Sequence, residues 1–281
     1  MGLGAVALGC SVAPVDYGSD ANTGTTHALI TVERSDSPST ADAPRATAFA
    51  GFVRTPPEVD AHAVLQLAGF GLDLPAIGQC SGSAHQRDNS VPLSPLGRVE
   101  FLDAGDVVVH TDSTTATLAP RAFPSVTELI AGVVYTTRDR DAQPLPAGAN
   151  YTLSTSGGVL SPMSVITNAP ASLVGVTVDS TTFAELHTVS QHSSINLSWE
   201  PGQPSDLVYV ELTSRNGSAT TRCTFRDDTG SGIVPAGAFT GVGAGDLSLH
   251  RVRSQPFASG GVDAGEVRFD FEQTASVVFS D

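Results

Sequence analysis

The clearest pattern in this chain of 281 residues is a two-residue alternation of apolar and polar side chains in its last third. Within residues 194–199, the apolar Ile195, Leu197 and Trp199 alternate with serine and asparagine. Successive side chains of a strand point to opposite faces of a sheet, so this spacing predicts a strand with one buried face. We expect Trp199, the single tryptophan of the chain, to point into a core.

The same spacing continues on both sides of a predicted hairpin. Residues 206–213 place three apolar side chains on one face, and Asn216 and Gly217 then form a dipeptide favoured in tight hairpin turns. The strand after the turn places Cys223 on its apolar face, where we expect it to be buried. The three apolar side chains of the first strand are Val208, Val210 and Leu212.

Two further strands are predicted near the C-terminus. Val267, Phe269 and Phe271 alternate with charged residues, and residues 276–279 form a last short strand. Several short strands with turn signals between them are typical of a β-sandwich.

The first half contains short β-like runs separated by loops that contain proline and glycine. Residues 123–130 are predicted to form one or two turns of helix, and residues 61–75 show no clear period. We therefore predict an all-β protein of two β-sandwich domains in tandem, at residues 25–165 and 168–281. The predicted strands of the first domain are residues 27–32, 46–53, 98–102, 106–111, 132–137 and 151–155.

The C-terminal pattern resembles a known family. The run Leu197-Ser198-Trp199-Glu200-Pro201-Gly202, with Tyr209-Val210-Glu211-Leu212 ten residues beyond the tryptophan, is similar to the second and third strands of fibronectin type III and immunoglobulin-like domains. Residues 170–173 resemble the segment that opens such a domain. One departure is that residues 247–251 contain no tyrosine where those domains have a tyrosine corner. The resemblance implies a fold and no particular activity.

The N-terminus has the features of a bacterial lipoprotein signal. Residues 4–9 are apolar and small, Cys10 follows them, and residues 11–26 are small and polar, as in a flexible tether. We expect Cys10 to carry lipid. No basic residue precedes Cys10, so we expect the natural signal to begin upstream of Met1. The alternative is a short apolar N-terminus with a chance cysteine.

The whole chain also resembles two-domain bacterial envelope lipoproteins. That resemblance implies an extracytoplasmic protein that is anchored to the membrane by its lipid. Because Ser11 and not aspartate follows Cys10, it implies the outer membrane rather than the inner one.

Composition excludes several classes of function. The chain contains no lysine, so Schiff-base enzymes, pyridoxal enzymes and phosphate loops lack their central residue. A formal net charge of -15 would repel nucleic acid, which we do not expect as a partner.

The other two cysteines form an even pair. If Cys10 is acylated and the chain is exported, Cys80 and Cys223 lie in a compartment that permits disulfides. We expect them to be bonded; the alternative is two buried free thiols.

The sequence contains no recognisable catalytic or metal-binding motif. It has no Gly-x-Ser-x-Gly, no Cys-x-x-Cys and no helical histidine pair, and its seven histidines are dispersed. Ser81 and Ser83 lie near His85, but serine-rich loops are common throughout the chain. We therefore predict no catalytic residue, no metal site and no cofactor.

Two pairs of acidic residues could supply oxygen ligands to calcium. Asp139 and Asp141 alternate with Arg138 and Arg140, and Asp227 precedes Asp228. Each pair offers too few ligands for calcium, which takes six to eight, so we interpret both as solvated loops.

These observations favour a non-enzymatic, membrane-anchored lipoprotein acting in adhesion, scaffolding or surface interaction, with protein or glycan partners at the cell surface. A carbohydrate-binding or accessory module is an alternative, and it predicts an exposed aromatic cluster or a calcium site. The second alternative is a hydrolase whose catalytic residues are brought together only in the folded chain. This alternative predicts a cleft where histidine and carboxylates converge with perturbed pKa values.

Overall fold

The computed structural model describes residues 24–37, 43–67, 69–82, 99–126, 130–137, 145–215 and 219–280. Cys10 and most of the expected tether lie outside them. The described part is almost entirely β, which confirms the predicted class. Its one α-helix is α1, at Ala61–Leu67, in the segment that shows no clear period. None of the described helices is long and apolar enough to cross a membrane.

Strands β1 to β9 belong to the first half of the chain. Their bounds are Thr25–Asp36, Arg45–Thr55, Cys80–Gly82, Val99–Phe101, Val107–His110, Thr115–Val126, Ile130–Thr137, Asn150–Thr155 and Met163–Asn168. Strands β10 to β18 follow, with bounds Thr177–Val178, Thr181–Thr182, Thr188–Ser190, Ile195–Ser198, Leu207–Ser214, Thr220–Arg226, Ser231–Val234, Gly243–Ser259 and Val262–Ser280.

The second half of the chain is a β-sandwich. One layer has the strand order β11-β10-β13-β16, and the other contains β15-β14-β17-β18. In the usual lettering, β10, β13 and β16 are strands A, B and E of one layer, and β15, β14, β17 and β18 are strands C′, C, F and G of the other. This is a Greek-key arrangement of the immunoglobulin-like kind. The absent tyrosine corner therefore does not change the topology.

The core of the sandwich confirms the alternation seen in the sequence. Ile195, Leu197 and Trp199 of the first layer face the apolar side chains of β14, and all of them are buried. Cys223 is fully buried among them, as predicted.

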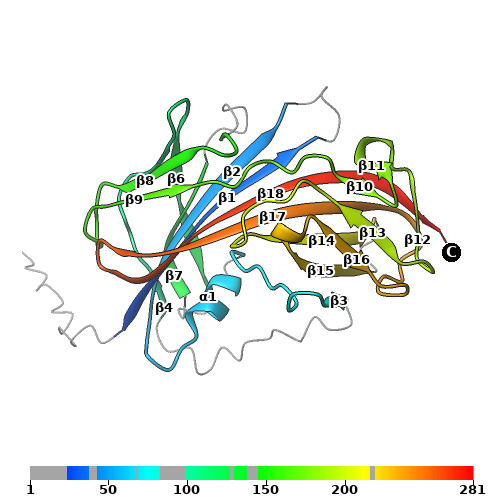
Figure 1. Cartoon of the computed structure of the whole chain (residues 1–281). Coiled ribbons are helices and arrows are strands. Elements are labelled where there is room, and N and C mark those ends of the chain that lie inside the picture. The colour runs from blue at the N-terminus through cyan, green and yellow to red at the C-terminus, as the bar shows by residue number, and fades with distance from the viewer. Residues whose placement is uncertain are drawn as a thin grey trace, which may run out of the picture.

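Two strands run the length of the molecule. Figure 1 shows β17 and β18, in orange and red, as one long hairpin that passes from the sandwich into the first half. At about 3.3 Å per residue, the 19 residues of β18 extend roughly 60 Å. The two strands predicted at residues 267–271 and 276–279 are thus one continuous strand. The prediction of separate strands was wrong, because β18 pairs with β17 without a register shift through residues 272–275, although the apolar alternation is interrupted there.

The hairpin supplies side chains to both cores. Leu247, Leu249 and Phe279 pack in the sandwich, whereas Phe269 and Phe271 pack in the core of the first half. Strand β1 pairs with β18 in parallel, from His27 opposite Ala264 to Asp36 opposite Gln273. That the chain divides at residues 165–168 into two domains that fold independently stays a prediction. The packing shows that the hairpin of β17 and β18 belongs to both halves.

The first half is one sheet that curls around its own core. The sheet continues from β18 through β1, β2, β7, β6, β5 and β8 to β9, and β9 returns beside β17. The Thr167 hydroxyl bonds to Gln255, and Gln255 Nε2 donates to Asn168 Oδ1 at 3.1 Å. Side chains of β17 and β9 thereby close the gap between the two ends of the curled sheet.

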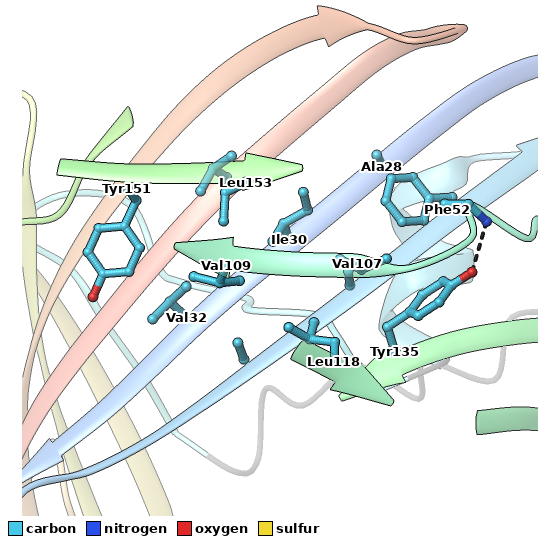
Figure 2. Packing of buried hydrophobic residues seen from close by; sticks show 14 of the residues in the cluster. Ala28, Ile30, Val32, Phe52, Val107, Val109, Leu118, Tyr135, Tyr151 and Leu153 are labelled. Carbon is cyan, nitrogen blue, oxygen red and sulfur yellow. Dashed lines mark hydrogen bonds between the residues drawn. The ribbon is translucent and has the colours of Figure 1, made fainter. Parts of the chain in front are cut away.

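Figure 2 shows how the two layers of this sheet meet. Val109 and Leu153 face Ile30 and Val32 across the core, and all four are buried. The Tyr135 hydroxyl accepts a bond from the Ala104 amide and donates to Asp103, each at 2.8 Å. Burial, opposed in part by the Ala104 amide, raises the pKa of Tyr135 to about 12. Its hydroxyl is therefore a hydrogen-bond donor and not a charged group at neutral pH.

The predicted helix at residues 123–130 is wrong. Strand β6 continues to Val126 and β7 begins at Ile130, and the two pair antiparallel with one irregularity between Phe123 and Val126. Pairing with the next strand of the chain decided the conformation, and the spacing of apolar residues within 123–130 does not report that pairing.

A polar joint separates the two cores on the inward face of the hairpin. The apolar positions of β17 are interrupted there by Arg251, Arg253 and Gln255. Arg251 donates to the carbonyls of Ala171 and Ser172 at 3.2 and 3.1 Å, and Arg253 donates to those of Asn168 and Ala169 at 3.2 Å each. The arginines therefore hold the segment that connects the two halves.

Two buried carboxylates neutralise these arginines. Asp206 makes two bonds of 2.7 Å to Arg253, and Asp227 lies 2.8 Å from Arg251 Nε. Asp227 also accepts the indole N–H of Trp199 at 2.9 Å. The prediction of a solvated loop at Asp227 and Asp228 was therefore wrong for Asp227, which is fully buried, whereas Asp228 pairs with Arg226 at the surface.

Replacing Arg253 with methionine should lower the free energy of unfolding by about 3–5 kcal/mol, because Asp206 would remain buried without its cation. Urea denaturation measures this loss. Arg226→Met, which breaks the exposed pair with Asp228, is the matched control and should leave the urea midpoint unchanged. Equal effects of the two substitutions would contradict a structural role for the joint.

Candidate functional site

A groove lies on the outer face of the sheet shared by the two halves. It has a volume of about 410 Å³ and crosses β15, β14, β17, β18, β1 and β2. Its position follows from the strand alternation. Tyr209, His250 and Asp270 occupy the positions between the residues that face the cores, so they point outward.

The connector between α1 and β3 borders this groove. Gly71 and Leu72 line it, and Figure 1 shows the connector crossing from α1 to β3 in cyan. The Phe70 carbonyl accepts a bond from Arg268, and the Gly78 amide donates to the Thr224 carbonyl at 2.7 Å. The connector is therefore attached to the sheet at both of its ends.

His250 lies at the floor of the groove between two carboxylates. Its Nδ1 lies 2.8 Å from Asp270 Oδ1, and its Nε2 lies 3.4 Å from Glu272 Oε2. The ring stacks on Tyr209 with centroids 4.1 Å apart, and the Tyr209 hydroxyl donates to the other oxygen of Asp270 at 2.9 Å. We call His250, Asp270, Glu272 and Tyr209 the histidine clamp.

The electrostatics of the clamp favour a charged imidazole. Burial disfavours the charge, but Asp270, followed by Glu272 and Glu211, outweighs it and raises the pKa of His250 above its usual value. Burial and the charge of Asp270 raise the pKa of Tyr209, so its hydroxyl keeps its proton. When the imidazole is protonated, the clamp is a cation held by two anions and one aromatic face.

Two of the arginines that line the groove are paired with carboxylates. Glu211 forms an ion pair with Arg222, and Arg34 bonds to Asp36 at 2.8 Å. Glu33 lies at the exposed rim, 3.5 Å from the Thr47 hydroxyl. Partial burial by the groove walls and the charge of Asp270 raise its pKa.

The groove meets one condition of the hydrolase alternative, because a histidine and carboxylates converge there with shifted pKa values. It does not assemble a serine triad, however. The Ser248 hydroxyl pairs with that of Thr274 at 2.8 Å, and both nitrogens of His250 face carboxylates. A charged imidazole with both nitrogens engaged has no free lone pair to act as a general base.

A metal site is not evident in the described ranges either. They contain no group of three or more histidine, cysteine, aspartate or glutamate side chains placed to hold an ion.

A second, smaller pocket of about 240 Å³ lies over the polar joint. Arg251 and Arg253 line it, but both are bonded to buried carboxylates and to carbonyls of the connecting segment. The two arginines are therefore not free to bind a ligand; the exposed Glu200 also lines this pocket.

The residues singled out in the sequence have different outcomes. Cys80 and Cys223 are bonded to each other, although 143 residues separate them. His187 and His192 are exposed. Ser81 lies in β3. The remaining candidates lie outside the described residues: Cys10, Ser83, His85, Asp139 and Asp141.

The clamp was missed in the sequence. Its members lie at residues 209, 250, 270 and 272, and only the register of β14, β17 and β18 brings them together. The available signal was that the polar positions of these strands carry aromatic and ionisable residues rather than serine and threonine.

The carbohydrate-binding alternative predicted an exposed aromatic platform. Among the aromatic residues whose side chains the structure describes, all are buried or partly buried. Tyr209 lines the groove, but it is only 3% exposed.

Comparison with known proteins gives no family. No protein-family model and no curated protein matches the chain. Among solved structures, a segment of two fibronectin type III domains from chicken tenascin is 11% identical, with a TM-score of 0.24, covering 85% of this chain and 95% of that one. The Fcho1 Mu homology domain of Danio rerio is 9% identical over 90% of this chain and 97% of that one, with a TM-score of 0.29.

The FN1–FN3 domains of chicken CNTN1 are 11% identical over 83% of this chain and 78% of that one, with a TM-score of 0.22. With scores this low, the strand order and not the overall superposition supports the assignment of the sandwich.

Replacing Tyr209 with phenylalanine should lower the free energy of unfolding by about 1.5–3 kcal/mol, because Asp270 loses a charged hydrogen bond. Tyr209→Leu should cost more, because it also removes the ring that stacks on His250. Urea titrations of both variants measure the difference. A phenylalanine variant as stable as the natural protein would contradict the bond.

Proposed function

We propose that this protein is a non-enzymatic lipoprotein of the cell envelope that acts in adhesion, scaffolding or surface interaction. Lipid on Cys10 anchors it, in the outer membrane, and the two β halves extend from that anchor. The bond between Cys80 and Cys223 carries this proposal, because disulfides form and persist in oxidising, extracytoplasmic compartments. An exported chain with a signal-like Cys10 fits the same location.

The groove supports a binding role over a catalytic one. Its charges are mostly paired, and its one histidine is engaged at both nitrogens. A rigid β scaffold with a polar groove can recognise a partner without breaking bonds in it.

A glycan-binding accessory module is the second candidate, and one observation favours it. The groove is lined by carboxylates and by hydroxyls such as that of Ser248, which can bond to sugar hydroxyls. An aromatic stacking platform is not among the described residues, so protein partners stand first.

The lipid anchor is tested by replacing Cys10 with serine in the protein expressed from its native gene. The natural chain should fractionate with membranes and carry the mass of an acylated cysteine, whereas the variant should be released and lack that mass. Intact mass spectrometry of both fractions measures this. Ser11→Ala is the control that should remain in the membrane. A natural chain that is free of lipid would overturn the anchor.

The compartment is tested through the two other cysteines. Protein quenched in acid and treated with a maleimide under denaturing conditions should show no labelling at Cys80 or Cys223 until it is reduced. Reduction should lower the free energy of unfolding by up to about 4–5 kcal/mol, because it frees a long loop of the unfolded chain. Free thiols in the native product would contradict an oxidising location.

A further inference from the structure

The histidine clamp points to a pH-responsive element in the floor of the groove. We propose that the proton on His250 holds β14 and β18 together on this face, and that its loss loosens the floor of the groove. The proposal concerns the folded chain itself and does not depend on the identity of any partner.

The geometry gives the reason. A neutral imidazole has one N–H and one lone pair, so in the clamp one ring nitrogen would point its lone pair at a carboxylate. The charged ring can donate to Asp270 and Glu272 together. Loss of the proton therefore replaces one attraction with a repulsion, in a place where His250 is only 8% exposed.

The groups facing His250 from other elements do not compensate for that loss. Strand β14 contributes Tyr209 and Glu211, and β18 contributes Asp270 and Glu272. Strand β1 contributes Glu33 and Arg34, and Arg34 is paired with Asp36. Strand β15 contributes Arg222, which is paired with Glu211. Strand β2 contributes Thr47 and, at the exposed rim, Arg45; the connector contributes only Gly71 and Leu72.

Next to Glu33, Arg268 supplies a further positive charge on β18, but it bonds to the Phe70 carbonyl at the start of the connector. Without the proton on His250, four carboxylates line the groove, and Glu211 alone keeps a close ion pair there. The carboxylates are Glu33, Glu211, Asp270 and Glu272.

The direction of the pH effect follows from the raised pKa of His250. In the unfolded chain the imidazole has its ordinary pKa of about 6.5. Because the folded pKa is higher, the proton stabilises the fold fully below about pH 6.5, and this contribution is lost as the pH rises through the folded pKa. The floor of the groove is therefore expected to loosen above the folded pKa of His250 and not at acidic pH.

The first test is a titration of the histidine side chains by NMR in the intact chain. His250 should titrate above pH 6.5, and Glu272→Gln should lower its midpoint. Asp270→Asn should lower it further, because Asp270 is the closer carboxylate. A His250 midpoint at or below 6.5 would overturn the proposal.

The second test separates the clamp from general stability. The folding equilibrium constant of the natural chain, relative to His250→Gln, should be largest at pH 5.5. It should fall by up to about tenfold per pH unit between the two pKa values. His192→Gln is the matched exposed control and should show no such dependence.

Amide hydrogen exchange shows whether the loosening is local. After correction for the intrinsic rates, residues 247–252 and 268–273 should exchange faster at pH 8.5 than at pH 6, whereas β8 should not change. If the His250→Gln variant does not fold, the proposal is still tested by amide hydrogen exchange of the natural chain and by the NMR titration of the Glu272→Gln variant. Equal protection at both pH values would refute the loosened floor.

Discussion

The fold depends on two arginines buried at the middle of one hairpin. Arg251 and Arg253 lie on the inward face of β17, where apolar side chains precede and follow them, and they bond to the segment that joins the two halves. Asp227 and Asp206 neutralise them. A charge this deeply buried is tolerated only with partners, so these bonds fix where one core ends and the other begins.

The same strands carry the groove on their other face. Because side chains alternate, each residue that packs in a core has a neighbour that points outward, and β14, β17 and β18 thereby line up Tyr209, His250 and Asp270. The connector from α1 borders this surface. The groove thus lies on a continuous sheet shared by both halves.

Much of the fold follows from the sequence, and the site does not. The alternation around Trp199 and Cys223 correctly predicted the buried faces of the sandwich, because the apolar side chains along a single strand identify the face that is buried. The same reasoning failed at residues 123–130 and divided β18 in two. Hairpin pairing with β7 decides the end of β6, and β18 crosses between two cores without a turn.

By itself, the sequence determined that this is an all-β protein, that its apolar positions form sheets with one face inward, and that no familiar catalytic motif is present. Only the tertiary structure decided that one hairpin serves both cores, that Asp227 is a buried counter-ion, and that His250 meets Asp270, Glu272 and Tyr209. The reason is physical. Alternation is a property of neighbours in the chain, whereas the pairing of charges depends on the register between strands far apart in sequence.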